Sequence, residues 1–103
     1  MEQFKNVNVN KKANIYFDGK CVSHTIICRD GSRKSVGVIF PSTLVFNTGE
    51  PETMEILDGC CRVRQQDQST WLEFKTGNTF KVAGDSEFEI ETVETVHYVC
   101  HFG

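Results

Sequence analysis

Short apolar runs and stretches of alternating apolar and polar residues, separated by turn residues, make up most of this sequence. Residues 86–92 show the pattern most clearly, because Phe88 and Ile90 fall on one face of an extended strand and three glutamates fall on the other. Helical periodicity is not sustained over any segment. Nine strands are therefore expected, at residues 21–28, 35–40, 43–47, 52–57, 60–65, 70–75, 79–82, 86–92 and 96–102. That number of strands is typical of a closed barrel or a double-sheet barrel.

Turn residues between the strands predict where the chain reverses. Asp30-Gly31 ends the first predicted strand, and Asp58-Gly59 is a strong hairpin signal after which residues 60–65 are expected to pair back. A chain of 103 residues fits one domain, and no linker or repeat divides it. We expect residues 1–13, a polar stretch, to form a flexible or extended N-terminal arm and residues 14–103 to form a single domain.

Composition and charge narrow the possible partners. Apolar residues make up 39% of the chain, which is ordinary for a globular protein. The net charge of −3 repels a polyanion, so no nucleic acid polymer is expected as a partner. No apolar run is long enough for a signal peptide or a membrane span, so we expect a cytoplasmic protein without membrane contact.

The five cysteines do not predict a disulfide or a redox motif. Their number is odd, and they lack the paired C-x-x-C spacing of zinc and redox sites. The neighbours Cys60 and Cys61 point to opposite faces of a strand, which disfavours a bond between them. We expect reduced, mostly buried thiols, as in other proteins of the cytoplasm.

The spacing of several residues resembles the two sequence motifs of the cupins, which are small jelly-roll barrels. With Glu52 at the acidic position of the first motif, its two histidine positions fall on Phe46 and Thr48. The second motif, laid from Gly77, places its histidine on Phe88. The fold predicted from this resemblance is an all-β, cupin-type double-stranded β-helix, or jelly-roll barrel.

The histidines that hold a metal in such barrels are missing at all three positions. One carboxylate cannot hold a divalent metal against water, because tight sites need three or four protein ligands. His97 and His101 are expected about 13 Å apart along a strand, and His24 stands alone, so they do not replace the missing ligands. No metal and no other cofactor is predicted, and the three histidines are interpreted as partly exposed or core residues.

Several strings of residues carry a more specific resemblance, and they extend over nearly the whole chain, from about Tyr16 to Phe102. They are Tyr16-Phe17-Asp18-Gly19-Lys20, Arg33-Lys34-Ser35-Val36-Gly37-Val38, residues 46–54 (FNTGEPETM), residues 77–80 with Ser86-Glu87-Phe88, and Tyr98 with Cys100. These strings are similar to those of the pyrimidine/purine nucleoside phosphorylase family of small single-domain cupins. The sequence departs from that family at Ala83, where a proline is usual, and in its long N-terminal arm.

The resemblance implies an enzyme, a pentosyltransferase that acts as a homodimer. Its reaction would cleave the N-glycosidic bond of diverse purine and pyrimidine nucleosides with inorganic phosphate, giving the free base and a pentose 1-phosphate without a metal. The bond breaks with oxocarbenium character at the sugar. Such a site needs an anion cradle for phosphate, carboxylates that orient the sugar hydroxyls, and a wall that excludes water.

Candidates exist for the charged roles. Arg33 is the candidate catalytic residue that holds phosphate with its planar fork, and Ser35 and Lys20 are candidate additional donors. Glu52 is the candidate catalytic carboxylate, because the fold aims its position into the barrel. Both have plainer interpretations: Arg33 follows a hairpin turn, where a solvated charge is common, and Glu52 could cap the turn before it.

The remaining candidates would contact the substrate. Phe46, Phe88 and Tyr98 could form the dry wall against sugar and base, although strand aromatics are more often plain core. Glu87 is a weaker candidate, because it shares one sheet face with Glu89 and Glu91, and that face looks solvated.

Two alternatives to an enzyme remain open at this point. A non-catalytic cupin that binds a small sugar or nucleotide would tolerate the loss of the metal ligands equally well. A dimerising structural module would simply fill its barrel with phenylalanine and methionine.

Overall fold

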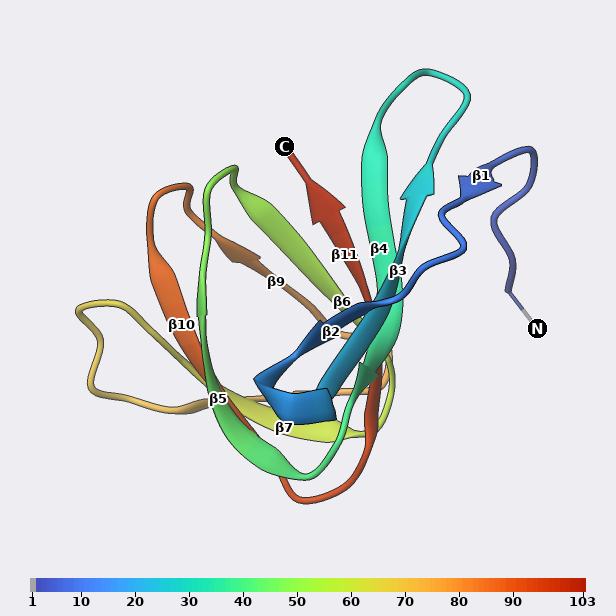
Figure 1. Cartoon of the computed structure of the whole chain (residues 1–103). Coiled ribbons are helices and arrows are strands. Elements are labelled where there is room, and N and C mark those ends of the chain that lie inside the picture. Colours follow the sequence, from blue (N-terminus) through green and yellow to red (C-terminus); the bar gives the residue numbers. More distant parts are fainter. Residues whose placement is uncertain (1) are drawn as a thin grey trace.

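The computed structural model describes residues 2–103, and these form strands and one short 3-10 turn (Figure 1). The elements are β1 (Asn8–Val9), β2 (Asn14–Tyr16), η1 (Phe17–Gly19), β3 (Cys21–Ile27), β4 (Arg33–Ile39), β5 (Ser42–Asn47), β6 (Glu52–Asp58), β7 (Cys60–Gln65), β8 (Leu72–Lys75), β9 (Thr79–Val82), β10 (Glu87–Thr92) and β11 (Val96–Phe102). All nine predicted strands are present, with ends that shift by one or two residues, so the strand prediction is confirmed.

The strands build two antiparallel sheets. The larger sheet has the order β1-β3-β4-β11-β6-β9, with β2 paired to β3, and the smaller sheet has the order β5-β10-β7-β8. Every strand pair is antiparallel. Figure 1 shows the two sheets curving around a common interior. The predicted all-β double-sheet barrel is confirmed.

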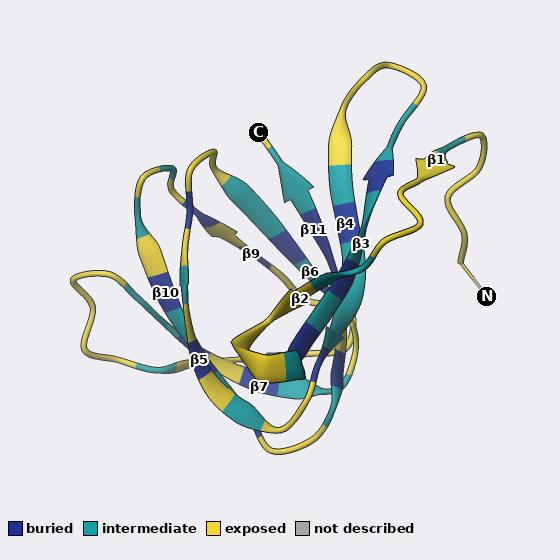
Figure 2. Cartoon of the chain, viewed as in Figure 1, coloured by how far each residue is buried: buried dark blue, intermediate teal, exposed yellow. Residues whose placement is uncertain are grey.

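The core lies between the sheets and follows the alternation of the strands. On β10, Phe88 and Ile90 are buried, and on β11 Val96, Tyr98 and Cys100 point the same way. Figure 2 shows buried positions along the middle of the strands and exposed residues in most connecting loops. This pattern is the one expected when each strand turns one face to the interior.

The two Asp-Gly turns behave differently. Asp30-Gly31 joins β3 to β4, which pair over their whole length as predicted. The second prediction was wrong: β6 pairs with β11 and β9, whereas β7 pairs with β10 and β8, so the chain changes sheets at Gly59. Gly59 has φ +105°, and a Cβ there would lie 2.9 Å from the Thr95 carbonyl oxygen. The glycine therefore serves a close chain crossing and not a hairpin.

The N-terminal segment is fixed to the edge of β3. β1 pairs with the C-terminal end of β3, and β2 pairs with its N-terminal end. Between them, the Asn10 amide donates to the Thr25 carbonyl at 2.9 Å. The Nδ1 of His24 lies 3.1 Å from the Asn10 carbonyl oxygen. Residues 8–16 thus place polar side chains next to β3. No helix among residues 2–103 has the length and apolar character needed to cross a membrane.

Candidate functional site

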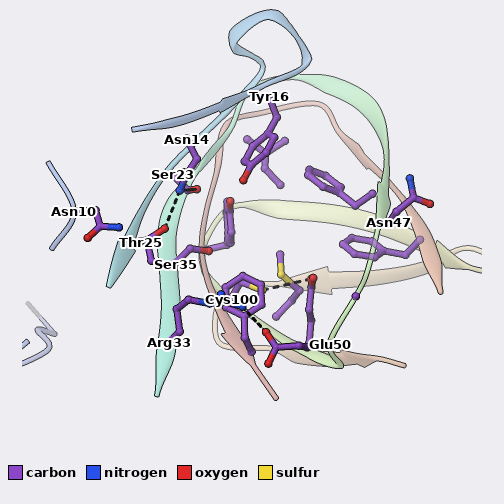
Figure 3. Close-up of a pocket in the computed structure, with 18 of the residues that line it drawn as sticks. Asn10, Asn14, Tyr16, Ser23, Thr25, Arg33, Ser35, Asn47, Glu50 and Cys100 are labelled. Atoms are coloured by element: carbon purple, nitrogen blue, oxygen red, sulfur yellow. Dashed lines mark hydrogen bonds and ion pairs between the residues drawn. The ribbon is translucent and has the colours of Figure 1, made fainter. Parts of the chain in front are cut away.

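A cavity of about 720 Å³ opens between the two sheets (Figure 3). Its lining comes from alternate residues of β3, β4, β6 and β11, from β5 and β10, from the loop that joins β5 to β6, and from the N-terminal segment. The lining residues are Asn10, Asn14, Tyr16, Ser23, Thr25, Ile27, Arg33, Ser35, Ile39, Phe46, Asn47, Gly49, Glu50, Glu52, Met54, Phe88, Tyr98, Cys100 and Phe102. The volume is in the range of small-molecule sites, which span about 300–1,000 Å³.

The structure brings six of the eight sequence-predicted site residues together around this cavity: Arg33, Ser35, Phe46, Glu52, Phe88 and Tyr98. The other two lie elsewhere. Lys20 is exposed and directly follows the η1 turn in the sequence. Its backbone amide donates to the Phe17 carbonyl at 3.1 Å. Glu87 is exposed and lines a separate shallow hollow of about 210 Å³ on β10. The alternation that turns Phe88 inward turns Glu87 away from the cavity.

Arg33 stands at the rim of the cavity with its charge already engaged. Its Nη2 pairs with Glu50 Oε2, and its guanidinium carbon lies 4.7 Å from the centroid of the Phe102 ring. Both charged side chains are about half exposed, at 49% and 55%. Figure 3 shows Arg33 and Glu50 extending toward each other from opposite sides of the opening. Among the described lining residues, Arg33 is the only lysine or arginine.

Glu52 lies deeper, at the start of β6, next to a thiol. The Cys100 sulfur is 3.4 Å from Glu52 Oε1 and donates to it. Burial raises the pKa of the Glu52 carboxyl above its ordinary value, the neighbouring charge of Glu50 raises it further, and the contact with Cys100 opposes both effects. Burial, followed by the proximity of Glu52, raises the pKa of the Cys100 thiol, so the thiol stays protonated. Glu52 is thus a half-buried carboxyl that pairs with no cation among residues 2–103.

Tyr98 presents a hydroxyl at the floor of the cavity. Its oxygen lies 3.4 Å from the Cys21 sulfur, and Ser23 is a further hydrogen-bond partner. Burial raises the pKa of the Tyr98 hydroxyl far above its ordinary range. The phenol therefore remains neutral and can only donate or accept a hydrogen bond.

Polar side chains from the N-terminal segment and β3 form one wall. The Asn14 amide nitrogen donates to the hydroxyls of Ser23, at 3.3 Å, and Thr25, at 3.0 Å. Ser35 on β4 is adjacent, and the residue is 7% exposed. Figure 3 shows these side chains on the same side of the cavity. The wall offers several neutral donors and acceptors to a polyhydroxylated ligand.

Aromatic rings form the opposite wall. Phe46 stacks on Phe88 with ring centroids 5.4 Å apart, and Phe17 meets Phe46 edge-on at 5.2 Å. Tyr16 also lines the cavity, and Figure 3 shows its ring pointing inward. This wall is apolar and offers ring faces on which a flat heterocycle can stack.

The donor set of the cavity does not fit a metal of the cupin type. Phe46 and Phe88 occupy two of the three histidine positions, and Thr48 at the third does not line the cavity. The Thr48 hydroxyl instead donates to the Ala83 carbonyl at 2.7 Å and accepts from the Ser86 amide at 2.9 Å. Within residues 2–103, no three His, Cys, Asp or Glu side chains gather as metal ligands would.

The histidines lie away from the cavity. His101 bridges Lys34 Nζ at 3.1 Å and Glu55 Oε1 at 3.0 Å on the outer face of the larger sheet, and His97 is exposed. None of the three lines the cavity. Their interpretation as partly exposed residues agrees with these positions.

Sequence reasoning did not identify several lining residues, chiefly Asn14, Tyr16, Ser23, Thr25 and Glu50. A signal was available for two of them. Ser23 and Thr25 share a strand face with buried Cys21, and small polar residues at inward positions indicate a polar cavity wall. Asn14 and Tyr16 reach the cavity only because β2 pairs with β3, which composition alone does not predict.

Comparison with known proteins gives one consistent result. The family model for pyrimidine/purine nucleoside phosphorylase matches residues 11–102. A pyrimidine/purine nucleoside phosphorylase of Cupriavidus pinatubonensis is 59% identical over 103 residues, covering 100% of this chain and 98% of that protein. One of Dechloromonas aromatica is 57% identical and covers both chains completely.

Solved structures agree with the sequence comparison. A protein of unknown function from Acinetobacter sp. ADP1 has a TM-score of 0.96 and 48% identity, and 98% of each chain is covered. The solved structure of FeII HppE shares the fold alone. Its TM-score is 0.76 at 10% identity, and the match covers 99% of this chain and 63% of that chain. Its cupin-like barrel confirms the predicted fold type. The chain belongs to the pyrimidine/purine nucleoside phosphorylase family.

Proposed function

We propose that the protein is a nucleoside phosphorylase that converts diverse purine and pyrimidine nucleosides and inorganic phosphate into the free base and a pentose 1-phosphate. The observation that carries this proposal is the cavity itself, in a chain of this family. A single guanidinium stands at its rim, a half-buried carboxyl lies inside, and a hydroxyl wall faces an aromatic wall. These are the parts that the reaction requires.

Phosphate is assigned to Arg33, because it is the one cation that the described part of the chain contributes to the cavity. A guanidinium binds two phosphate oxygens with its planar fork. Ser35 is on the same strand face, two residues further on, and can add a hydroxyl donor. An oxygen of phosphate held there forms the new bond to the sugar C1′ as the C1′–N bond breaks. The electron pair of the C1′–N bond passes to the base nitrogen, which takes up the proton that the attacking hydrogen phosphate gives up, so that the products are the free base and the pentose 1-phosphate.

Glu52 is assigned to the sugar. Its carboxyl lines the same cavity as the hydroxyls of Ser23, Thr25 and Ser35, so it can orient sugar hydroxyls and face the positive charge that develops at the ring. Burial, the largest cause, raises its pKa, so the group is also able to hold a proton at a higher pH than an exposed glutamate. Lys20 and Glu87 have no part in this assignment because they lie outside the cavity.

The aromatic wall supports a broad range of bases. Phe46, Phe88 and Tyr16 offer ring faces, and every purine and pyrimidine has a ring face to stack on them. A site that grips phosphate and sugar by hydrogen bonds, and the base only by stacking, discriminates little between bases. Tyr98 contributes a neutral hydroxyl at the floor.

We propose that the reaction needs no metal or other cofactor, because the cavity provides carboxyl and protonated thiol groups without imidazoles.

A homodimer in the cytoplasm is proposed from the family resemblance. The five cysteines are unpaired with one another, as expected for a reducing compartment.

The test is a product assay with adenosine and uridine, each with and without inorganic phosphate, in the presence of a chelator. The proposal expects release of free base only with phosphate, a pentose 1-phosphate as the sugar product, and no loss with the chelator. Base release without phosphate, giving free pentose, would contradict phosphorolysis. An inert protein whose melting temperature rises with a nucleoside would instead indicate a non-catalytic binding cupin.

A further inference from the structure

The guanidinium assigned to phosphate is already paired with a carboxylate of the same chain. Arg33 Nη2 contacts Glu50 Oε2, and the guanidinium carbon of Arg33 lies 4.7 Å from the centroid of the Phe102 ring. Carboxylate and phosphate oxygens use the same fork of N–H donors. Glu50 and a phosphate therefore cannot both engage that edge of the guanidinium fully.

The position of Glu50 is built into the loop between β5 and β6. On one side of it, the Gly49 carbonyl accepts from the Asp85 amide at 3.0 Å. On the other side, the Pro51 carbonyl accepts from the Gly103 amide at 2.8 Å. A Cβ at Gly84 would lie 2.9 Å from the Gly49 carbonyl oxygen, so the two loops pack closely. The backbone on either side of Glu50 is thereby held, and its side chain projects toward Arg33 (Figure 3).

Arg33 is held equally well on its side. It is the first residue of β4, directly after a hairpin in which the Cys28 amide donates to the Ser32 carbonyl at 2.8 Å. The Ser32 amide in turn donates to Asp30 Oδ1 at 2.9 Å. Two fixed backbones therefore present one cation and one anion to each other, and only the side chains need to move for the pair to open.

The other charges that line the cavity make the ion pair of Arg33 and Glu50 important for phosphate binding. The described lining carries one cation, Arg33, and two carboxylates, Glu50 and Glu52. A phosphate that entered without displacing Glu50 would share a single guanidinium with that carboxylate. Ion pairs as exposed as this one are weak, so an incoming dianion can displace the carboxylate.

We propose that Glu50 is an intramolecular competitor of phosphate for Arg33, and that the exchange of Glu50 for phosphate sets the phosphate affinity of the site. In the absence of phosphate, Glu50 neutralises Arg33. When phosphate binds, the Glu50 side chain turns away into solvent, and it returns when the phosphorylated product leaves. This proposal rests on the assignment of Arg33 as the phosphate site in the proposed function.

The experiment measures binding of inorganic phosphate alone to the full chain by isothermal titration calorimetry. For Glu50→Gln, we expect phosphate to bind about three- to tenfold more tightly than to the wild type, as for removal of a weak competing ion pair. The matched control is Glu94→Gln, which removes the same charge from an exposed loop outside the cavity and should leave the affinity within about twofold.

A double-mutant cycle separates competition at Arg33 from a general charge effect. Arg33→Ala should lose phosphate binding by tenfold or more, and Glu50→Gln should bring no gain in that background. In steady-state assays, Glu50→Gln should lower the KM for phosphate and leave the KM for the nucleoside unchanged.

Phosphate binding by Glu50→Gln that is unchanged or weaker than in the wild type would overturn the proposal. So would an equal gain in phosphate affinity when Glu50→Gln is added to Arg33→Ala, or the absence of measurable phosphate binding by both the wild type and Glu50→Gln. Because calorimetry needs no nucleoside, the two proposals can fail separately. Tighter phosphate binding by Glu50→Gln in a protein that cleaves no nucleoside would support the inference and contradict the proposed function.

Discussion

The cavity and the outer face of the smaller sheet contain the same kinds of charged residue in opposite arrangements. On the outer face, Arg62 Nε lies 3.0 Å from Glu91 Oε1, and Arg64 Nη2 lies 2.6 Å from Glu89 Oε1. These pairs are directly cross-strand between β7 and β10. Trp71 lies under both guanidinium groups, at 4.9 and 4.6 Å from its ring.

In the described lining of the cavity, by contrast, carboxyl groups outnumber cations. Arg33 pairs with Glu50, the carboxylate that a phosphate would have to displace in the proposed site, and Glu52 has a thiol as its partner and no cation among the described residues. On the outer face, Arg62 and Arg64 are each neutralised by a glutamate of the neighbouring strand, which leaves neither guanidinium free for a ligand. In the cavity, burial raises the pKa of Glu52, which means that keeping its carboxyl ionised there costs the fold free energy, as is common for residues of functional sites.

The largest expected effect is on activity, and it separates the two regions. Arg33→Ala and Glu52→Gln should each lower kcat/KM for phosphorolysis by about 10²-fold or more, because each removes a positioned electrostatic contact. Arg64→Ala, on the outer face, should stay within about twofold of the wild type. The measurement is kcat/KM with inosine and phosphate. Equal losses of kcat/KM in all three variants would contradict the claim that only the cavity acts in the reaction.

The second effect concerns the loop that carries Glu50. Thr48→Val should destabilise the fold by about 1–3 kcal/mol, because it leaves the Ala83 carbonyl and the Ser86 amide without the hydroxyl partner they have now. Thermal unfolding should show a fall in Tm of roughly 4–12 °C. Thr48→Ser keeps the hydroxyl and should retain most of the stability. A Thr48→Val protein as stable as the wild type would show that this anchor is unimportant.

The third effect is the pH dependence of stability. The pKa of Glu52 is raised in the folded state, so its protonated form favours folding, and this contribution is lost as the pH rises from about 4.5 through the raised pKa. Glu52→Gln should therefore be more stable than the wild type near neutral pH, by roughly 2 °C in Tm, with a smaller difference near about pH 4. A difference in Tm that shrinks as the pH rises would contradict this account.

The smallest effect belongs to the outer face. Glu89→Gln should change the free energy of unfolding by less than about 1 kcal/mol, because the pair it breaks with Arg64 is partly exposed and screened. Urea unfolding at low and high salt measures the change. A loss of several kcal/mol would show that these pairs hold the sheet together, contrary to the comparison drawn above.

The fold was largely predictable from alternation, because each long strand has one buried face. The same rule placed the glutamates of β10 on a solvated face, and the pairs of Glu89 and Glu91 with arginines confirm it. The change of sheet at Gly59 was not predictable, since an Asp-Gly turn indicates a reversal but does not determine which strand pairs next. Short β1 and β2 were missed because their polar residues are ordered by pairing with β3.

The candidate site was predictable only in part. Glu52 and Phe88 followed from the cupin spacing and from alternation, and both line the cavity. Lys20 was chosen from a resembling string, but the η1 turn leaves it outside. Glu50 was not chosen, because a carboxylate in a polar loop has no sequence signal for its partner. Its pairing with Arg33 arises because the β5–β6 loop and the first residue of β4 meet only in the folded chain.

A crystal structure of the protein grown with inorganic phosphate would test the central claim most directly. The account predicts phosphate oxygens within hydrogen-bond distance of the Arg33 guanidinium inside the cavity, with the Glu50 carboxylate turned away. Phosphate bound elsewhere, with the pair of Arg33 and Glu50 intact, would contradict it.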